Sequence, residues 1–362
     1  MNKLGYILLI AAIGSGFANA QETQRLTANK LNEYGLIYSL PKTHLNIEVE
    51  AVKTTKKAGP FFKYAKKYLG ATNIVTADAQ SWDIKNVAIS TFGVADKDEE
   101  YLMQFKAGAA PYMILDSEGL PLAINAEVTP QSTSHRQNQI AEPTPLDGNT
   151  LNVFSEDMIA GESTMKRAEA AAAKIFELRE TRNDLVSGNA DQMPPDGESL
   201  KLMLDELNRQ ESILTAMFVG VTTTETVVSR FDYVPTADVT NEVIFRISDY
   251  NGVVDASDLS GEPVYLTIAT TVKGELPVNE KGEVKEAPKG AVMYCIPGKA
   301  NVALNYNGKR IAIKDVEVAQ FGVKFGLNPK LFIDKKAPAY VIYNPDTGAL
   351  LKMGTTTAPA AE

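Results

Sequence analysis

The side chains that most often carry nucleophilic or metal chemistry are scarce in this sequence, which has two histidines and one cysteine. A single cysteine cannot form a disulfide within the chain, and no Cys-x-x-Cys pair is present to bind zinc or exchange thiols. His44 lies beside the start of a predicted strand, and His135 lies in a segment without apolar periodicity. We interpret both histidines as surface residues, because a Ser-His-Asp or Cys-His site needs a histidine oriented beside its nucleophile.

Carboxylates are plentiful, with 45 aspartate and glutamate residues, so two chemistries that need no histidine stay open. Glycoside hydrolysis requires two carboxyl groups at a set separation, but the acidic run at residues 96–100 is more typical of a solvated loop. Calcium binding requires closely spaced oxygen ligands, and the candidate ligands are Asp249, Asn251, Asp255 and Asp258. Their spacing departs from an EF-hand, because the glycine comes early and the distal glutamate is missing. An acidic turn is therefore the competing interpretation, and no catalytic residue or cofactor is predicted.

The overall composition is that of a globular protein. Of the 362 residues, 44% are hydrophobic and 22% are charged, which is too apolar for a disordered chain. The formal net charge is −9 at pH 7. This balance argues against a nucleic-acid partner, because binding to a phosphate backbone needs clustered positive charge. The sequence also has no Walker-type glycine-rich phosphate loop, which disfavours nucleotide chemistry.

The first twenty residues have the parts of a secretory signal peptide. Lys3 supplies the positive start, residues 4–13 form a short apolar run, and residues 18–20 have the small-x-small pattern that precedes cleavage. We predict cleavage after Ala20 and export to the periplasm or the cell surface. No cysteine follows the apolar run, so no lipoprotein is predicted, and no later segment is apolar enough to predict a membrane crossing.

The rest of the chain alternates between β patterns and one helical region. Residues 45–51 alternate strictly between apolar and polar side chains, which predicts a strand with one buried face. Further strands are predicted at residues 82–91 and 100–105. The predicted units are an N-terminal β module with one short helix (21–127), a polar linker or loop (128–160), a helical hairpin (161–219), a β region (220–285), a C-terminal β module similar to residues 35–125 (286–353) and a flexible tail (354–362).

The helical hairpin is predicted from residues 163–186 and 199–218. The first helix has an alanine run without internal proline or glycine, and Ser163 suits its N-cap. In the second helix apolar residues recur at three-four spacing, and its leucine face consists of Leu200, Leu207 and Leu214. We expect the pair to pack on the β core through this leucine face. The alternative is a protruding arm that binds partners.

Two distant segments, residues 84–94 and 313–323, are identical at six of eleven positions without a gap. The same order of similar segments continues on both sides: residues 38–41 resemble 294–297, and residues 111–114 with a turn ending at Gly119 resemble residues 338–342 with a turn ending at Gly348. We interpret this as a duplicated β-sandwich-like module, so the predicted fold class is α+β, mainly β with an inserted α-helical hairpin. Convergent strand and turn chemistry is the alternative.

The repeat also bears on the single cysteine. Cys295 occupies the position that Ser39 has in the first copy. A position that accepts either serine or cysteine is typical of a small, half-buried site in a strand. We therefore predict a structural residue and not a nucleophile.

Several short motifs occur together with the signal, at residues 38–42, 59–65, 196–200, 204–207 and 319–322. As a set they resemble an uncharacterised domain-of-unknown-function family of exported bacterial proteins, DUF4831-like. The resemblance covers nearly the whole mature chain. It implies a bacterial cell-envelope setting and carries no catalytic signature.

These observations predict an exported, non-catalytic cell-envelope protein that binds a protein or glycan partner. The alternative is a carboxylate-dependent hydrolase acting on polysaccharide or cell-wall glycan. Paired carboxylates and aromatic side chains in one cleft would favour the enzyme, whereas an exposed apolar patch would favour the binding protein.

Overall fold

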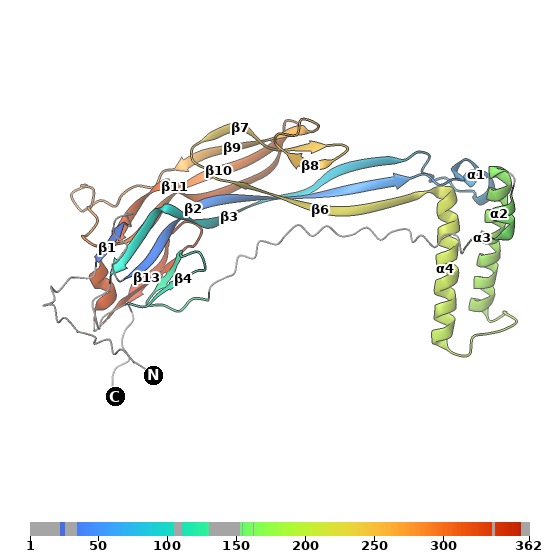
Figure 1. Ribbon diagram of the computed structural model, residues 1–362, viewed down its shortest axis with the longest axis horizontal. Coiled ribbons are helices and arrows are strands. Elements are labelled where there is room, and N and C mark those ends of the chain that lie inside the picture. Colours follow the sequence, from blue (N-terminus) through green and yellow to red (C-terminus); the bar gives the residue numbers. More distant parts are fainter. Residues whose placement is uncertain are drawn as a thin grey trace, which may run out of the picture.

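The computed structural model describes residues 22–25, 35–104, 111–129, 153, 155–161, 163–334 and 337–355. The molecule is elongated: a β body lies at one end, a narrow β ribbon extends from it, and the long helices lie at the far end of the ribbon (Figure 1). Three antiparallel sheets and a few helices make the protein mainly β, which confirms the predicted α+β class. The predicted signal peptide with Ala20, His135 and most of the predicted linker and tail lie outside the described residues.

The three sheets have the following strands in spatial order. The first contains β1 (Glu22–Arg25), β3 (Ala79–Gln104), β2 (Leu36–Lys57) and β6 (Val221–Tyr233). The second contains β11 (Lys309–Leu327), β10 (Val292–Tyr306), β9 (Glu262–Val272), β7 (Val239–Ser248) and β8 (Gly252–Asp255). The third contains β13 (Leu350–Thr355), β12 (Ala339–Tyr343), β5 (Pro121–Ile124) and β4 (Met113–Leu115).

The helical elements are η1 (Phe62–Tyr64), α1 (Ala65–Leu69), α2 (Glu156–Ala160), α3 (Thr164–Ser187), α4 (Gly197–Val219) and η3 (Pro329–Ile333). Helices α3 and α4 form the predicted hairpin. The Ser163 side chain caps α3 by accepting a hydrogen bond from the Lys166 amide, and Gly188 ends the helix in the left-handed conformation. Asp196 caps α4 by accepting from the Ser199 amide.

The first two sheets pack face to face around one hydrophobic core. The alternation at residues 45–51 works as predicted: Leu45, Ile47 and Val49 are buried, while the polar side chains between them are half-buried. They meet side chains of the second sheet such as Phe245 and Leu266. A second core lies between these sheets and the third sheet; its largest buried side chains include Tyr38, Tyr343 and Met103.

One backbone hydrogen bond between a strand and a hairpin turn occurs at equivalent positions in the two predicted copies. The Ser39 amide donates to the Gly119 carbonyl at 3.0 Å, and the Cys295 amide donates to the Gly348 carbonyl at 2.9 Å. Both glycines have positive φ angles, of 88° and 69°. Strand pair β2–β3 with hairpin β4–β5 therefore has its counterpart in strand pair β10–β11 with hairpin β12–β13.

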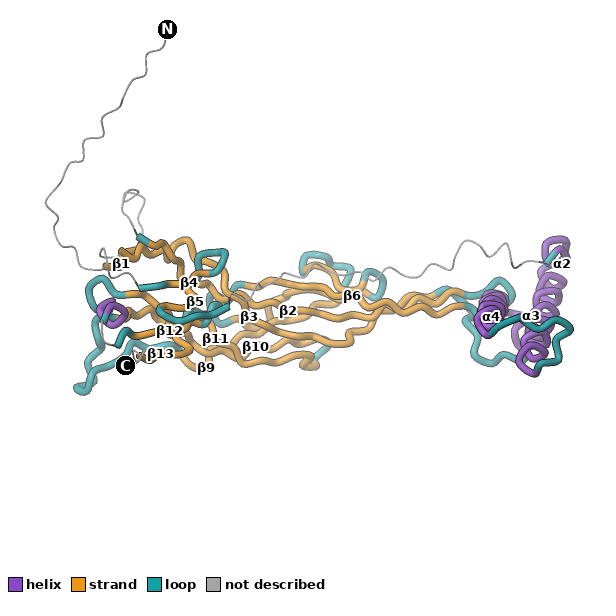
Figure 2. The backbone as a smooth tube through the Cα atoms, turned by 90° about the horizontal axis from the view of Figure 1, so that it is seen from below, coloured by secondary structure: helices purple, strands orange, loops and turns teal. Residues whose placement is uncertain are grey.

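Two expectations differ from the structure. The strands predicted at residues 82–91 and 100–105 are one continuous strand, β3, because a register shift absorbs the acidic residues between them. The expectation that the helical hairpin packs on the β core is wrong. Figure 2 shows the helices beyond the end of the ribbon, and their core contains no residue of the two β cores.

Candidate functional site

The ribbon that carries the helices is formed by β2, β3 and β6 beyond the last large core side chain of β2, Val49. From Glu50 to Lys57 it extends about 26 Å at ~3.3 Å per residue. Side chains on both faces are mostly half-buried or exposed, so cross-strand pairs of β-branched and oppositely charged residues stabilise it in place of a core. These pairs include Thr54 with Thr224, Thr55 with Thr223, and Lys53 with Glu225.

The turn between β7 and β8 braces the ribbon. The carbonyl oxygen of Tyr250 accepts hydrogen bonds from Trp82 Nε1 at 3.1 Å and from Gln80 Nε2 at 2.5 Å. Gly252 lies so close to the indole that a Cβ atom would be 2.6 Å from the ring. Lys53 lies over the Trp82 ring, with Nζ 5.7 Å from the ring centre. The brace fixes the direction in which the ribbon leaves the body.

The same turn contains the predicted calcium ligands Asp249 and Asn251. Asp255 and Asp258 follow it. Each carboxylate accepts a hydrogen bond, at 2.9 Å, from the backbone amide of the serine two residues further along the chain. Hydrogen bonds from these serines, Ser257 and Ser260, lower the pKa of both carboxyls. Among the described residues, no three His, Cys, Asp or Glu side chains come together to hold a metal ion. Calcium binding at this turn stays a prediction.

Two glycines join the helices tightly to the ribbon. A Cβ atom at Gly59 would lie 2.2 Å from the carbonyl oxygen of Met217, in the last turn of α4. Gly220, between α4 and β6, has a φ of 80°, and a Cβ atom there would lie 2.5 Å from the Lys57 carbonyl oxygen. Only glycine permits both approaches. The Phe61 amide donates to the same Met217 carbonyl at 2.8 Å, so the end of β2 and the end of α4 are held together.

The helical elements at the ribbon tip, α1 to α4 with η1, form a unit that we call the head. Its core is built on the small residues of α3, since Ala168, Ala171 and Ala172 are buried and allow close packing. Phe61, from the segment after β2, packs against Phe218 of α4 with ring centres 5.4 Å apart. The head therefore has its own hydrophobic core, separate from the β body.

A charged cluster links α3 to α4. Glu211 of α4 accepts hydrogen bonds from Arg179 Nε at 2.6 Å and from Arg182 Nη1 at 2.5 Å. Burial raises the pKa of Glu211, but the hydrogen bonds and charge of the two arginines outweigh burial and hold the pKa below its ordinary value. The sequence shows the arginines crowded at the end of α3, but it does not show their partner 29 or more residues away.

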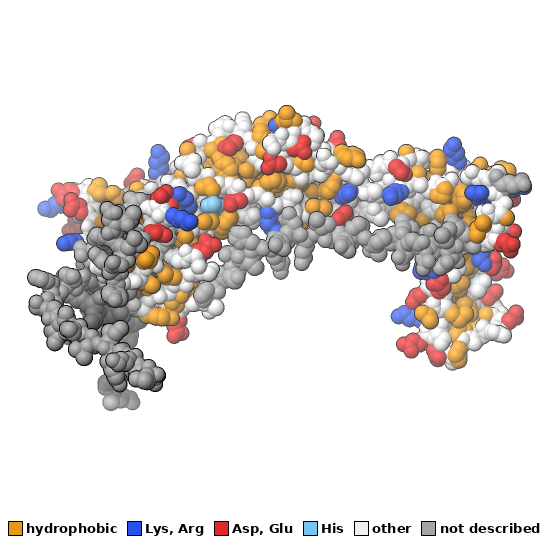
Figure 3. Space-filling model, viewed as in Figure 1, with side chains coloured by type: hydrophobic (Ala, Val, Ile, Leu, Met, Phe, Trp, Pro, Cys, Tyr) orange, Lys and Arg blue, Asp and Glu red, His pale blue; other side chains and the backbone are white. Residues whose placement is uncertain are grey.

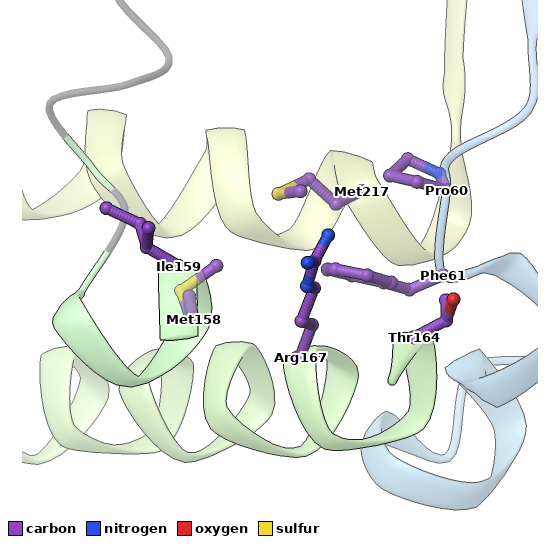
Figure 4. Close-up of a pocket in the computed structure, with 7 residues that line it drawn as sticks. All are labelled: Pro60, Phe61, Met158, Ile159, Thr164, Arg167 and Met217. Atoms are coloured by element: carbon purple, nitrogen blue, oxygen red, sulfur yellow. The ribbon is translucent and has the colours of Figure 1, made fainter. Parts of the chain in front are cut away.

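A groove with a volume of about 500 Å³ opens between α2, α3 and the joint with the ribbon. Figure 4 shows Arg167 rising from α3 into this groove, between Met158 and Ile159 of α2 on one side and Phe61 on the other. Arg167 Nε donates to the Gly161 carbonyl at 2.7 Å, which uses one of the five donors of the guanidinium. The remaining lining residues are Pro60, Thr164 and Met217. Among its described lining residues the groove is thus mainly apolar, and Arg167 provides the one cation.

Apolar side chains also cover the outside of the head, as Figure 3 shows along the hairpin between the acidic side chains. Ile159, at the rim of the groove, is 67% exposed. Other large exposed apolar side chains of the head are Met165 and Phe176 of α3, Val186 near its end, and Leu202 and Met203 of α4. Of these side chains Ile159 lines the groove, and exposed apolar groups of this size are typical of an interaction surface.

The remaining predicted residues lie in the β body. His44 Nδ1 is 2.9 Å from an Asp232 carboxylate oxygen, on paired strands of the first sheet. Cys295, for which the sequence predicts a half-buried position, is fully buried, and burial raises the pKa of its thiol to about 12. In the acidic run, Asp96 pairs with Lys42 at 2.9 Å and Glu99 with Lys324 at 2.6 Å. These carboxylates tie neighbouring strands together.

Comparison with known families agrees with the fold. The family model of the domain of unknown function DUF4831 matches residues 34–351, nearly the whole chain. The chain belongs to this family. No curated protein and no solved structure matches the DUF4831 chain. In its described part, no helix has the length and apolar character that crossing a membrane requires.

Proposed function

We propose that this DUF4831 protein is exported to the cell envelope, where it binds a partner protein through the groove of the head and catalyses no reaction. One observation carries the proposal: an apolar groove with an arginine inside lies at the tip of a braced ribbon, away from both β cores. A ribbon of this kind holds a binding surface at a distance from the body.

The lining of the groove favours a protein over a glycan. Met158, Ile159, Pro60 and Met217 provide apolar contacts, and methionine adapts its shape to different side chains. The hydroxyl groups of a glycan would lose hydrogen bonds with water against such walls. Arg167 adds a guanidinium that suits a carboxylate. The expected ligand is therefore a peptide segment with an apolar side chain next to an acidic one.

A photo-crosslinking amino acid at Ile159 tests the binding site in the native envelope. We expect one partner protein to be captured there, and we expect Arg167→Glu to reduce the adduct strongly while Arg167→Lys retains part of it. The matched control places the crosslinker at Leu259, which is 80% exposed in the β body. Equal capture at both positions, or an adduct insensitive to Arg167→Glu, would contradict the proposal.

Purified protein incubated with cell-wall glycan tests the non-catalytic part of the proposal. We expect no turnover. Release of sugar products that is lost when a single aspartate or glutamate is substituted would favour the carboxylate-dependent hydrolase instead.

Export is tested by the N-terminal sequence of the protein recovered from the envelope fraction. We expect it to begin at Gln21, after the predicted cleavage at Ala20. Ala18→Leu should block cleavage and leave the longer precursor, because signal peptidase requires a small residue there. Recovery of an uncleaved chain from the cytoplasm would contradict export.

A further inference from the structure

The third sheet has β13 and β4 as its two edge strands in the described part of the chain. Its order is β13, β12, β5, β4, and in the described part of the chain neither β13 nor β4 pairs with a further strand. The outer strand β13 is unusually apolar for an edge, since Leu351 is 63% exposed and Met353 is 46% exposed. Exposed apolar edge strands readily pair with another chain.

The two hairpins of this sheet have equivalent strand pairing, although the second turn is one residue longer than the first. In the first, the Asp116 amide donates to the Leu120 carbonyl at 2.9 Å, and in the second the Asn344 amide donates to the Ala349 carbonyl at 2.8 Å. The register shift between Ile114 and Leu115 in β4 recurs between Ile342 and Tyr343 in β12. Strand β4 therefore corresponds to β12, and strand β5 corresponds to β13.

Within the molecule, the two copies meet where β5 of the first pairs antiparallel with β12 of the second. In this pair Ile124 lies opposite Val341, and Ala123 lies opposite Ile342. Because β13 is equivalent to β5 and β4 is equivalent to β12, the two edge strands correspond to the two strands that already pair in this internal contact. The chain thus carries, on its two outer edges, the two halves of a contact that it already makes internally.

We propose that β13 of one molecule pairs antiparallel with β4 of a second copy of this chain. The register transferred from the internal contact places Met353 opposite Met113 of the second copy. Met113, Ile124, Val341 and Met353 already form one row across the sheet, so the pairing continues that row into the next molecule. The interface is heterologous and leaves one edge free at each end, so it builds an open chain of molecules.

Disulfide trapping tests this register. Two single-cysteine proteins are made, Met113→Cys and Met353→Cys, each in a Cys295→Ser background, which reproduces the serine of the first copy. Directly opposite residues of an antiparallel pair have Cα atoms about 4.5–5.5 Å apart, which suits a disulfide. We expect the mixture of the two proteins to form a mixed disulfide dimer, and each protein alone to form little.

The control is Tyr250→Cys, whose side chain is 77% exposed on the turn between β7 and β8, away from the third sheet. The mixed dimer should form at least about tenfold faster than the Tyr250→Cys dimer, because pairing holds the two thiols at a high effective concentration. Leu351→Asp, on the Met353→Cys chain, should reduce the rate toward that of the control.

Three results would overturn the proposal. One is a mixed-dimer rate equal to that of the Tyr250→Cys control. Another is a Met353→Cys protein that dimerises alone as fast as the mixture, which would indicate symmetric pairing of two β13 edges. The last is a rate unaffected by Leu351→Asp. None of these outcomes depends on partner binding by the head, so the two proposals are tested separately.

Discussion

Phe218→Ala is expected to destabilise the head while the β body keeps its stability. Phe218 is fully buried in the head core, and the substitution removes its ring from the contact with Phe61. Truncating a buried phenylalanine to alanine costs about 3–5 kcal/mol. A folded unit of roughly 80 residues, the size of the head, is stable by about 4–12 kcal/mol, so the loss is a large part of the total.

Two spectroscopic signals separate the head from the body. Every α-helix of the described chain belongs to the head, so circular dichroism at 222 nm mainly follows the unfolding of the head. The only tryptophan, Trp82, lies where the ribbon meets the turn between β7 and β8, so its fluorescence follows the brace and the body. With denaturant, Phe218→Ala should shift the 222 nm transition to lower concentration and leave the fluorescence transition nearly unchanged.

The matched control is Phe245→Ala in the first β core, where Phe245 is fully buried and stacks on Phe231 with ring centres 4.7 Å apart. Phe245→Ala removes the same side-chain atoms as Phe218→Ala, and it should shift the fluorescence transition to lower denaturant concentration instead of the 222 nm transition. If both probes shifted together by the same amount in both variants, the chain would unfold as one cooperative unit. That result would refute the separation of the head core from the body.

Three further predictions concern single residues. Glu211→Gln should lower the free energy of unfolding of the head by about 1–2 kcal/mol at pH 7. Because the folded pKa of Glu211 is depressed, this difference should begin to shrink as the pH falls below the ordinary value of 4.5 and should vanish only below the folded pKa; thermal melts whose difference does not shrink as the pH falls would exclude the ion pairs as its cause. Cys295, with a pKa of about 12, should react with a thiol reagent at pH 8 only as the chain unfolds, and rapid labelling of the native protein would contradict its burial. Gly252→Ala should destabilise the body by about 1–3 kcal/mol and shift Trp82 emission to the red, whereas unchanged emission would mean that the brace does not depend on this contact.

The features that the sequence predicts best depend on local chemistry. Ser163 caps α3 as predicted, because a capping side chain acts within a few positions of itself. The repeat can be recognised in the sequence because its turns also depend on local chemistry. Each copy needs a glycine at the end of its hairpin turn, and Gly119 and Gly348 accept hydrogen bonds from equivalent strand amides.

The full length of the long strands cannot be predicted from the sequence, because a run of polar residues is more typical of a loop. Residues 96–99 are mostly acidic, yet they stay within β3, where Asp96 and Glu99 pair with Lys42 and Lys324. The strands of the ribbon are also polar. Threonine and charged pairs hold its strands together without the buried face that a period-two pattern detects. The groove cannot be predicted from the sequence either, because Phe61 and Arg167 are about a hundred residues apart and line one groove only in the folded head.

The position of the head shows that an amphipathic pattern predicts a buried helix face but not the core against which that face packs. The leucine face of α4 indicated that the helix buries one side, but Leu214 packs inside the head and not on the β body. Chain connection decides this outcome. Helix α4 ends at Gly220, β6 follows at once, and Val221 pairs with Lys57 at the far end of β2. A helix that enters the sheet at this end must lie beyond the ribbon, about 26 Å from the last large core side chain of β2. Its apolar face then requires a core of its own, which α3 and the Phe61 segment provide, and the apolar side chains that remain outside are available to a partner.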